Sequence, residues 1–272
     1  MPRIALGLEY DGSDFSGWQS QTDALGVQTV VEQALSEVAN HPVKVVAAGR
    51  TDAGVHAEMQ VVHFDTDSVR TERNWMLGGA AHLPGSVSIL WTREVPDSFH
   101  ARFSAQARGY RYFILNRGPR PALARQRTSW VRDALDESRM QEAATLLVGC
   151  HDFSSFRAAE CQARSPIRHL YELHVERRGE IVELAVKANA FLHHMVRNIA
   201  GVLIAVGRGD RPVEWVSEVL EARDRKKGGV TAPPGGLYLA SVRYPAAFGL
   251  PSERAAGPAS SGDTGVPSPD LV

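Results

Sequence analysis

Cysteines and long apolar runs are scarce in this sequence, and each scarcity removes a class of protein. Its two cysteines, Cys150 and Cys161, are too few for a disulfide framework and lack the spacing of metal ligands. No run approaches the roughly 18 apolar residues that a membrane span requires. Glu9 and Asp11 break the apolar start of the chain, which indicates a strand entering the fold and not a signal peptide. We therefore expect a protein of the reduced cytoplasm with no membrane segment.

The balance of charge argues against a general nucleic-acid binder, because the formal net charge of the 272 residues is −1. Its distribution argues differently. The stretch 101–132 contains no Asp, Glu or Lys but eight arginines, at positions 102, 108, 111, 117, 120, 125, 127 and 132. Arginine suits bidentate contacts to phosphate and stacking on bases. The stretch predicts a surface that binds a polyanion; the alternatives are a solvated basic face or ion pairs with acids elsewhere in the fold.

Hydrophobic periodicity predicts the element order β-α-β-β-α-β in the first part of the chain, the order of a ferredoxin-like unit. Apolar residues recur at helical spacing after Gly26, and β-branched residues mark the strands. The predicted elements are a strand over 4–10, a helix over 27–39, strands over 43–48 and 60–64, a helix over about 71–81 and a strand over 87–91.

A looser version of the same order follows and predicts a second α+β half. Its elements are a strand over 110–115, a helix over 133–148 closed by Gly149, a hairpin of 167–175 and 181–187, helices over about 191–206 and 212–222, and a strand over 237–243. We expect an N-terminal half over 1–104 and a C-terminal half over 105–245. Residues 246–272 are rich in Ala, Gly, Ser and Pro without apolar periodicity, so we expect a disordered tail.

A loop over 49–57 lies between two predicted strands, with Gly49 and Gly54 flanking a single carboxylate, Asp52. Glycines permit backbone conformations and close approaches that a side chain forbids. A loop held by a strand on each side is a common place for a reactive group. The alternative is an ordinary turn in which Asp52 caps a backbone amide.

The nonapeptide 49–57 resembles the signature of the tRNA pseudouridine synthase A family, in which the Asp is catalytic. Further blocks are similar to that family in the same order, over roughly residues 1–245. They are Tyr10-Asp11-Gly12 with Gly17-Trp18-Gln19, Phe99–Ser104, Tyr110-Arg111-Tyr112, His151–Arg157, Phe191–Asn198 and Thr231–Leu237. The resemblance implies two ferredoxin-like halves joined in a continuous antiparallel sheet, with a central RNA-binding cleft.

The resemblance also implies an activity: isomerisation of uridine to pseudouridine at positions 38, 39 and 40 in the anticodon stem-loop of tRNA. The target base would be flipped into the cleft, and Asp52 would be the nucleophile. Attack at C6, attack at C1′ and deprotonation of C2′ stay open. The product is an isomer of the substrate, so no cofactor is required. The family further implies a homodimer that recognises tRNA by shape and backbone charge.

Arg197 and Arg50 are the predicted catalytic partners of Asp52. Arg197 stands on an otherwise apolar helix, and because a buried charge needs a partner we expect an ion pair with Asp52. The alternative places Arg197 at a wet edge, beside another acid or a phosphate. Arg50 shares the side of Asp52 if the segment is extended. By resemblance it helps to extrude the target base, and the alternative is simple phosphate contact.

Four residues are predicted to bind substrate: Tyr110, Arg102, Arg108 and Arg111. Tyr110 is similar to the family tyrosine that packs on the flipped base, because an aromatic face is a stacking platform for any base. The alternative is a core tyrosine. Tyr112 and Trp18 are predicted to be packing residues.

We expect no metal site, although several histidines suggest one. His193 and His194 would point about 100° apart on a helix, and no carboxylate lies at a helpful spacing in the sequence. His56 and His63 are also expected to be structural or to contact RNA. Three rival functions stay open: a synthase with another RNA target, a non-catalytic RNA chaperone and, more distantly, a metal hydrolase.

Overall fold

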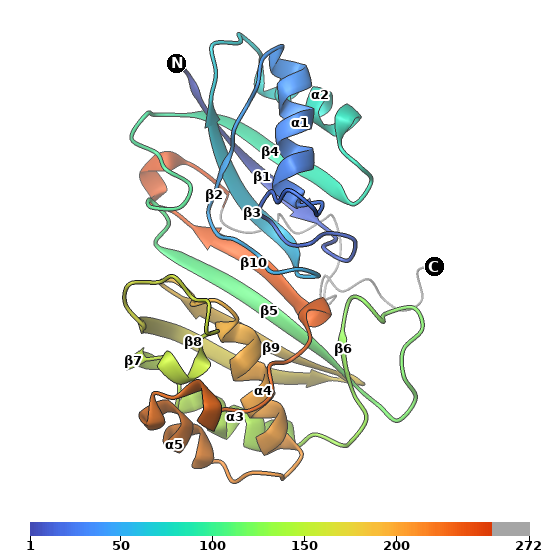
Figure 1. Ribbon diagram of the computed structural model, residues 1–272, viewed down its shortest axis with the longest axis vertical. Helices are drawn as coiled ribbons and strands as arrows, with labels where there is room; N and C mark the ends of the chain where they lie inside the picture. Colours follow the sequence, from blue (N-terminus) through green and yellow to red (C-terminus); the bar gives the residue numbers. More distant parts are fainter. Residues whose placement is uncertain (252–272) are drawn as a thin grey trace.

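The computed structural model describes residues 1–251 and confirms the predicted α+β class (Figure 1). A 10-stranded sheet has the order β4-β1-β3-β10-β5-β9-β8-β7, with β2 paired to β3 and β6 paired to β5. The helices gather toward the two ends of this sheet, and β10 and β5 cross its middle. Among the described residues, no helix is both long and apolar enough to cross a membrane.

The first half has the predicted β-α-β-β-α-β order, and its elements are β1 (Arg3–Tyr10), α1 (Val27–Ala39), β2 (Val46–Ala47), β3 (His56–Asp65), α2 (Glu72–His82) and β4 (Val87–Val95). Helix α1 has the predicted bounds and buries Val27, Val31 and Leu35 on its inward face. Strand β2 is much shorter than the predicted strand over 43–48 but still leads into the Asp52 loop.

The elements of the second half are β5 (Ala107–Asn116), β6 (Ser129–Val131), α3 (Glu137–Thr145), β7 (Gly149–Asp152), β8 (Ile167–Arg178), β9 (Ile181–Ala188), α4 (Met195–Gly207), α5 (Trp215–Ala222) and β10 (Leu237–Arg243). The predicted hairpin is confirmed as β8 and β9, with Gly179 at its turn in the left-handed region (φ 58°). Strands β6 and β7 were not predicted, because neither is long enough to show an alternating pattern.

Three predicted helices are too long at their N-terminal ends, and the one predicted over 212–222 begins only at Trp215, as α5. Helix α3 begins only after Asp136, whose side chain accepts a hydrogen bond from the Arg139 amide and so caps the helix. Gly149 does not close this helix but begins strand β7. Helix α4 begins at Met195 because the preceding residue, His194, has a left-handed backbone (φ 61°, ψ 5°).

The last strand of the chain, β10, joins the two halves. It pairs antiparallel to β5 and parallel to β3, where Tyr238 lies opposite His56 and Leu239 opposite Ala57. The pairing of β5 with β6 is also parallel. The sheet is thus continuous but not wholly antiparallel as expected, because strand direction follows from the connections and not from the apolar pattern.

Two separate apolar clusters form the core. The first lies with α1 and α2 and includes Leu35 and Trp75, and the second lies with α3 and α4 and includes Met140 and Leu203. Tyr110 on β5 packs against both clusters, so the middle of the sheet belongs to both halves.

The ordered chain extends past the point where the tail was predicted to begin. Residues 246–251 include a 3-10 turn, Ala246–Phe248, and the Phe248 ring lies 5.2 Å from the Phe99 ring. The remainder of the predicted tail, 252–272, lies outside the described residues.

Candidate active site

The loop that carries Asp52 is held tightly by the first half of the chain. Thr51 is buried, and its hydroxyl lies 2.8 Å from the Tyr10 hydroxyl while its carbonyl accepts a 3.0 Å bond from the Trp18 amide. Gly17 must be a glycine here: its φ is 97°, and a Cβ would lie 2.8 Å from the Thr51 carbonyl oxygen. Trp18 is buried, as its predicted packing role requires. These contacts fix the backbone on one side of Asp52.

The Asp52 carboxylate meets the second half of the chain through Arg197. The Arg197 Nη1 lies 3.0 Å from Asp52 Oδ2, and the two side chains are 14% and 20% exposed. The predicted ion pair is confirmed. The Arg197 Nε donates a 2.8 Å bond to the carbonyl of Ala232, so the guanidinium has partners on two sides. The largely buried charge of Arg197 is therefore compensated by the Asp52 carboxylate and by a backbone carbonyl.

Three of the segments that resemble the family, 151–157, 191–198 and 231–237, meet behind this ion pair. Asn198, next to Arg197, accepts hydrogen bonds from Arg225 (3.0 Å) and Thr231 (2.7 Å) and donates one to the Phe156 carbonyl (2.8 Å). Asn198 is buried, so this network fixes the start of α4 against the segment before β10. Arg225 was not predicted to have a role, since nothing in the sequence connects it to position 198.

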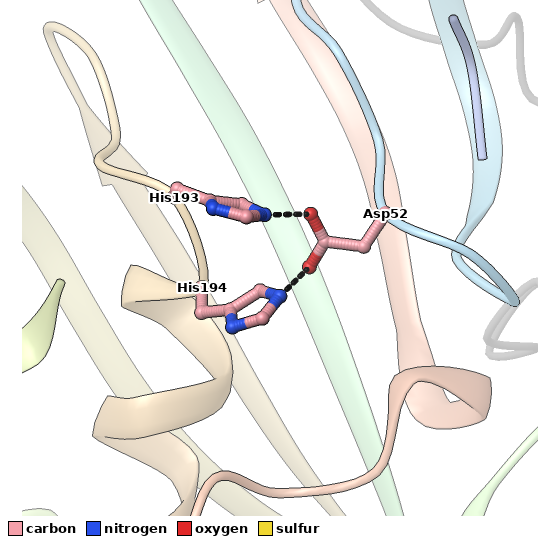
Figure 2. Close-up of side chains that lie close together, drawn as sticks. All are labelled: Asp52, His193 and His194. Atoms are coloured by element: carbon pink, nitrogen blue, oxygen red, sulfur yellow. Dashed lines mark ion pairs between the residues drawn. The ribbon is translucent and has the colours of Figure 1, made fainter. Parts of the chain in front are cut away.

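The positions of His193 and His194 differ from the sequence-based expectation that the two side chains diverge. Figure 2 shows both rings turned toward Asp52, with the Nε2 atoms of His193 and His194 each 3.3 Å from a different carboxylate oxygen. The expected divergence on a helix fails because both residues precede α4 and His194 is left-handed. No carboxylate lies at a helpful spacing in the sequence, but the fold brings Asp52 to them, and the three form a group whose ligand atoms all lie within 4.8 Å of one another.

The surroundings of His194 favour its neutral form. Burial lowers its pKa, and the neighbouring His193 and Arg197 lower it further, while Asp52 acts in the opposite direction. By contrast, His56 and His63 are structural, as one of the predicted alternatives has it. Each is buried and accepts a backbone hydrogen bond at Nδ1, from Gly12 (3.0 Å) and from Ala101 (3.1 Å) respectively.

Tyr110 lies beside the Asp52 loop. Its ring meets the Phe191 ring edge to face at 4.9 Å, and a Cβ on Gly49 would lie 3.9 Å from its hydroxyl. Burial raises the pKa of this hydroxyl, and the charge of Asp52 adds to the rise, so the phenol is neutral. Tyr112, two residues on, is fully buried and bonds to Ser129, which confirms it as a core residue.

The predicted arginines occupy different surroundings. Arg50 and Arg102 are exposed; Arg50 contacts no other described side chain by hydrogen bond or ion pair, and Arg102 lies 5.6 Å from the Phe103 ring. Arg108 donates to the carbonyls of Ala48 (2.9 Å) and Asn189 (3.1 Å), and so ties the strand before the Asp52 loop to the segment before α4.

Arg111 is not brought to this site. It pairs with Glu183 at 2.6 Å and Glu58 at 3.4 Å, and its guanidinium lies 4.8 Å from the Phe113 ring. Adjacent residues of a strand point to opposite faces, so Arg111 faces away from Tyr110. For this arginine the alternative of ion pairs with acids elsewhere in the fold is the one observed.

Comparisons with known proteins agree on one family. The family model described as tRNA pseudouridine synthase matches residues 8–104 and 143–245. A tRNA pseudouridine synthase A of Nitrosococcus oceani is 61% identical over 92% of this chain and 96% of the relative. Proteins of that name from Methylococcus capsulatus (61% identical, over 91% of this chain and 92% of the relative) and Stenotrophomonas maltophilia K279a (57%, over 92% and 98%) are also similar.

A solved structure, the crystal structure of a Cbf5-Nop10-Gar1 complex, aligns with 87% of this chain and 48% of that chain. The identity is 11% and the TM-score 0.36, too low a likeness to bear on function.

Proposed function

Because the chain belongs to the tRNA pseudouridine synthase family, and so isomerises uridine to pseudouridine in tRNA, we propose that it modifies positions 38, 39 and 40 of the anticodon stem-loop with Asp52 as nucleophile. The observation that carries the assignment of Asp52 is its ion pair with Arg197 at 3.0 Å. The pair joins a glycine-flanked loop of one half to an apolar helix of the other. The fixed cation compensates the charge of a carboxylate that is only 20% exposed.

The reaction breaks the N1–C1′ bond, turns the uracil and joins C1′ to C5; C5 loses its hydrogen to solvent as a proton, and N1 gains one. Asp52 would act on C6, on C1′ or on C2′, and in each case it must be ionised when the substrate arrives. Arg197 limits the movement of the carboxylate through its 3.0 Å contact with Oδ2. Since the product has the atoms of the substrate, the chemistry calls for no cofactor.

The base would leave the helical stack before it reacts. We propose that Arg50, which is exposed beside Asp52, fills the space that the extruded base vacates. Tyr110 would then offer its ring to the flipped uracil. Its partly buried position beside Phe191 supports this role, because a ring held by an edge-to-face contact keeps its orientation.

The tRNA would lie in a cleft between halves that we place at 1–104 and 105–245. Arg102, exposed beside Phe103, is placed to meet the phosphate backbone, and Arg108 supports the loops around it. Recognition would depend on shape and backbone charge, and therefore on salt. We further propose a cytoplasmic homodimer, as the resemblance to the family implies.

The test is release of tritium from C5-tritiated uridine in a tRNA transcript, with Asp52→Ala and Asp52→Asn compared with the wild type. We expect release by the wild type and a loss of about 10⁴-fold or more in both variants, with tRNA binding largely kept. Equal release by wild type and variants would show that another residue is the nucleophile. Mapping of pseudouridine in the treated tRNA then tests the positions, since modification outside the anticodon stem-loop would overturn the proposed target.

A further inference from the structure

The group formed by Asp52, His193 and His194 has the composition of a transition-metal site. It offers one carboxylate and two imidazoles, and these ligands suit zinc, copper and nickel ions, whereas magnesium and calcium prefer oxygen ligands alone. The three residues come from two segments that lie far apart in the sequence and meet only through the fold. Neither the family match nor the relatives' names speak of such a site.

The two contacts that the Asp52 carboxylate makes with the imidazoles have the length expected between two ligands of one zinc ion. Each imidazole Nε2 lies 3.3 Å from a carboxylate oxygen. Two ligands on one zinc ion with bonds of about 2.0–2.1 Å lie about 3.3–3.4 Å apart when the geometry is tetrahedral. Both observed contacts are slightly longer than the usual N–H···O distance of about 2.7–3.2 Å. Each histidine lies beside a different oxygen of the carboxylate, so an ion held by both imidazoles would take the carboxylate through both oxygens.

The site is also open to an ion from solvent, since the side chains of His193 and His194 are 41% and 28% exposed. The fourth position would be left to water. A group with three protein ligands and an open position has the pattern of an exchangeable site, not that of a closed structural one.

Arg197 limits how tightly an ion can bind. Its Nη1 lies 3.0 Å from Asp52 Oδ2, so a cation on the carboxylate meets a second positive charge. An ionised carboxylate has about four lone-pair sites, so both can be accommodated. The repulsion nonetheless predicts an unusual outcome: removal of a charged neighbour of the site should strengthen metal binding.

We propose that Asp52, His193 and His194 bind one divalent transition-metal ion of the zinc class in the tRNA-free enzyme, and that the ion and tRNA exclude each other. The ion would occupy the carboxylate that the reaction needs and so act as an inhibitor. This exclusion rests on the proposed role of Asp52, whereas binding of the ion does not.

Binding is tested on the full chain, without an affinity tag, by titration with Co²⁺ and displacement by Zn²⁺. We expect one ion per chain with the visible absorption of four-coordinate cobalt, and loss of this signal in Asp52→Asn. His193→Ala and His194→Ala should each weaken binding about tenfold or more, and Arg197→Met should strengthen it several-fold. The control is His169→Ala, an exposed histidine outside the group, which should leave binding unchanged.

Two results would overturn the site: no saturable binding, or saturable binding that persists in the Asp52 and both histidine variants. The second result would point to the free thiols, Cys150 and Cys161, and the double Cys→Ser variant identifies that case.

Exclusion is tested by tritium release at several concentrations of Zn²⁺ and tRNA. We expect Zn²⁺ to raise KM for tRNA without lowering kcat, and a chelator to restore the original rate. A fall in kcat at saturating tRNA would overturn the exclusion. If Co²⁺ binds through these residues but Zn²⁺ leaves tritium release unchanged, Asp52 is not at the chemistry and the proposed function fails at that residue. If no ion binds and Asp52→Ala is inactive, the proposed function stands and the metal site is refuted.

Discussion

The two halves of the molecule contribute to the site in different ways. The first half holds the Asp52 backbone by local contacts, with Thr51 bonded to Tyr10 and Trp18. The second half supplies cationic and imidazole groups from a segment with a left-handed residue and no side-chain cap on its helix. One half fixes a position, and the other sets the charge at that position. Neither half alone holds both members of the Asp52–Arg197 pair.

Polar contacts cross the boundary between the two halves, which we call the seam. The first apolar cluster includes Leu239 and Val242 of β10, and Arg108 adds polar contacts across the seam, with bonds to Ala48 on one side and Asn189 on the other. This comparison predicts that three kinds of substitution have separable effects. Removal of the cation beside Asp52 should affect activity, whereas removal of contacts across the seam or behind the Asp52 loop should affect stability.

The largest expected effect comes from removal of the charge that the second half supplies. Arg197→Met should lower the rate of tritium release about 10²–10³-fold, because it removes a fixed cation beside the carboxylate. Arg208→Met, a control at the end of the same helix where Arg208 pairs with Asp210 at 2.6 Å, should keep the wild-type rate. Single-turnover tritium release measures both. Similar rates for wild type and Arg197→Met would mean that the second half does not set the charge at Asp52.

The next effect is on the seam. Arg108→Met should lower the free energy of unfolding by about 3 kcal/mol, because it leaves carbonyls of both halves without their charged donor. Arg102→Met, which removes an exposed arginine, should change it by no more than about 0.5 kcal/mol. Urea denaturation followed by tryptophan fluorescence gives both values. A loss that is equally small in the two variants would show that the seam depends on apolar contact alone.

A pH-dependent effect should arise in the first half. Burial lowers the pKa of His63 from 6.5 to about 4, and its Nδ1 accepts the Ala101 amide. Between pH 6.5 and about 4, His63 binds a proton in the unfolded chain but not in the folded chain. The free energy of unfolding therefore falls as the pH drops through this window and levels off below it. We expect a loss of about 2 kcal/mol, somewhat less than the full shift implies, because solvent screens part of the effect of the neighbouring charge of Arg3.

His63→Asn tests this source of pH dependence, since the amide oxygen can accept the same backbone bond but does not titrate. The difference in unfolding free energy between pH 7 and pH 4.5 should shrink in this variant. An unchanged difference would assign the pH dependence to other groups.

The smallest effects compare two buried tyrosines, one in each half. Tyr10→Phe removes the partner of the buried Thr51 hydroxyl and should cost about 1.5 kcal/mol of unfolding free energy. Tyr112→Phe should cost about 0.5 kcal/mol. It removes the tyrosine hydroxyl that donates to the Pro233 carbonyl, but the Ser129 hydroxyl lies within 3.5 Å of that carbonyl and can donate in its place. Urea denaturation ranks the two, and the reverse order would show that the first half is not the more tightly fixed.

Local pattern was sufficient for much of this structure. Helix α1 and strand β10 have the predicted bounds, because the apolar periodicity of α1 is uninterrupted and β10 directly follows the turn residues 233–236. The pairing of Arg197 with Asp52 could also be predicted, since a charge on an apolar helix has few ways to be compensated. In both cases the physical cause acts within the segment or on the residue itself.

The tertiary structure alone decided the rest. The place of β10 between β3 and β5 depends on which strand edges stay unpaired once both halves have formed. The turn of His193 and His194 toward Asp52 follows from a positive φ at His194, which a short-range helical pattern does not reveal. Arg111 finds Glu58 and Glu183 on two other strands, although its sequence neighbours include no acid. Long-range strand pairing, ion pairs between distant residues and the positive φ at His194 are set by the folded chain as a whole. The residues that stabilise them lie far apart in the sequence, so a short segment does not reveal them.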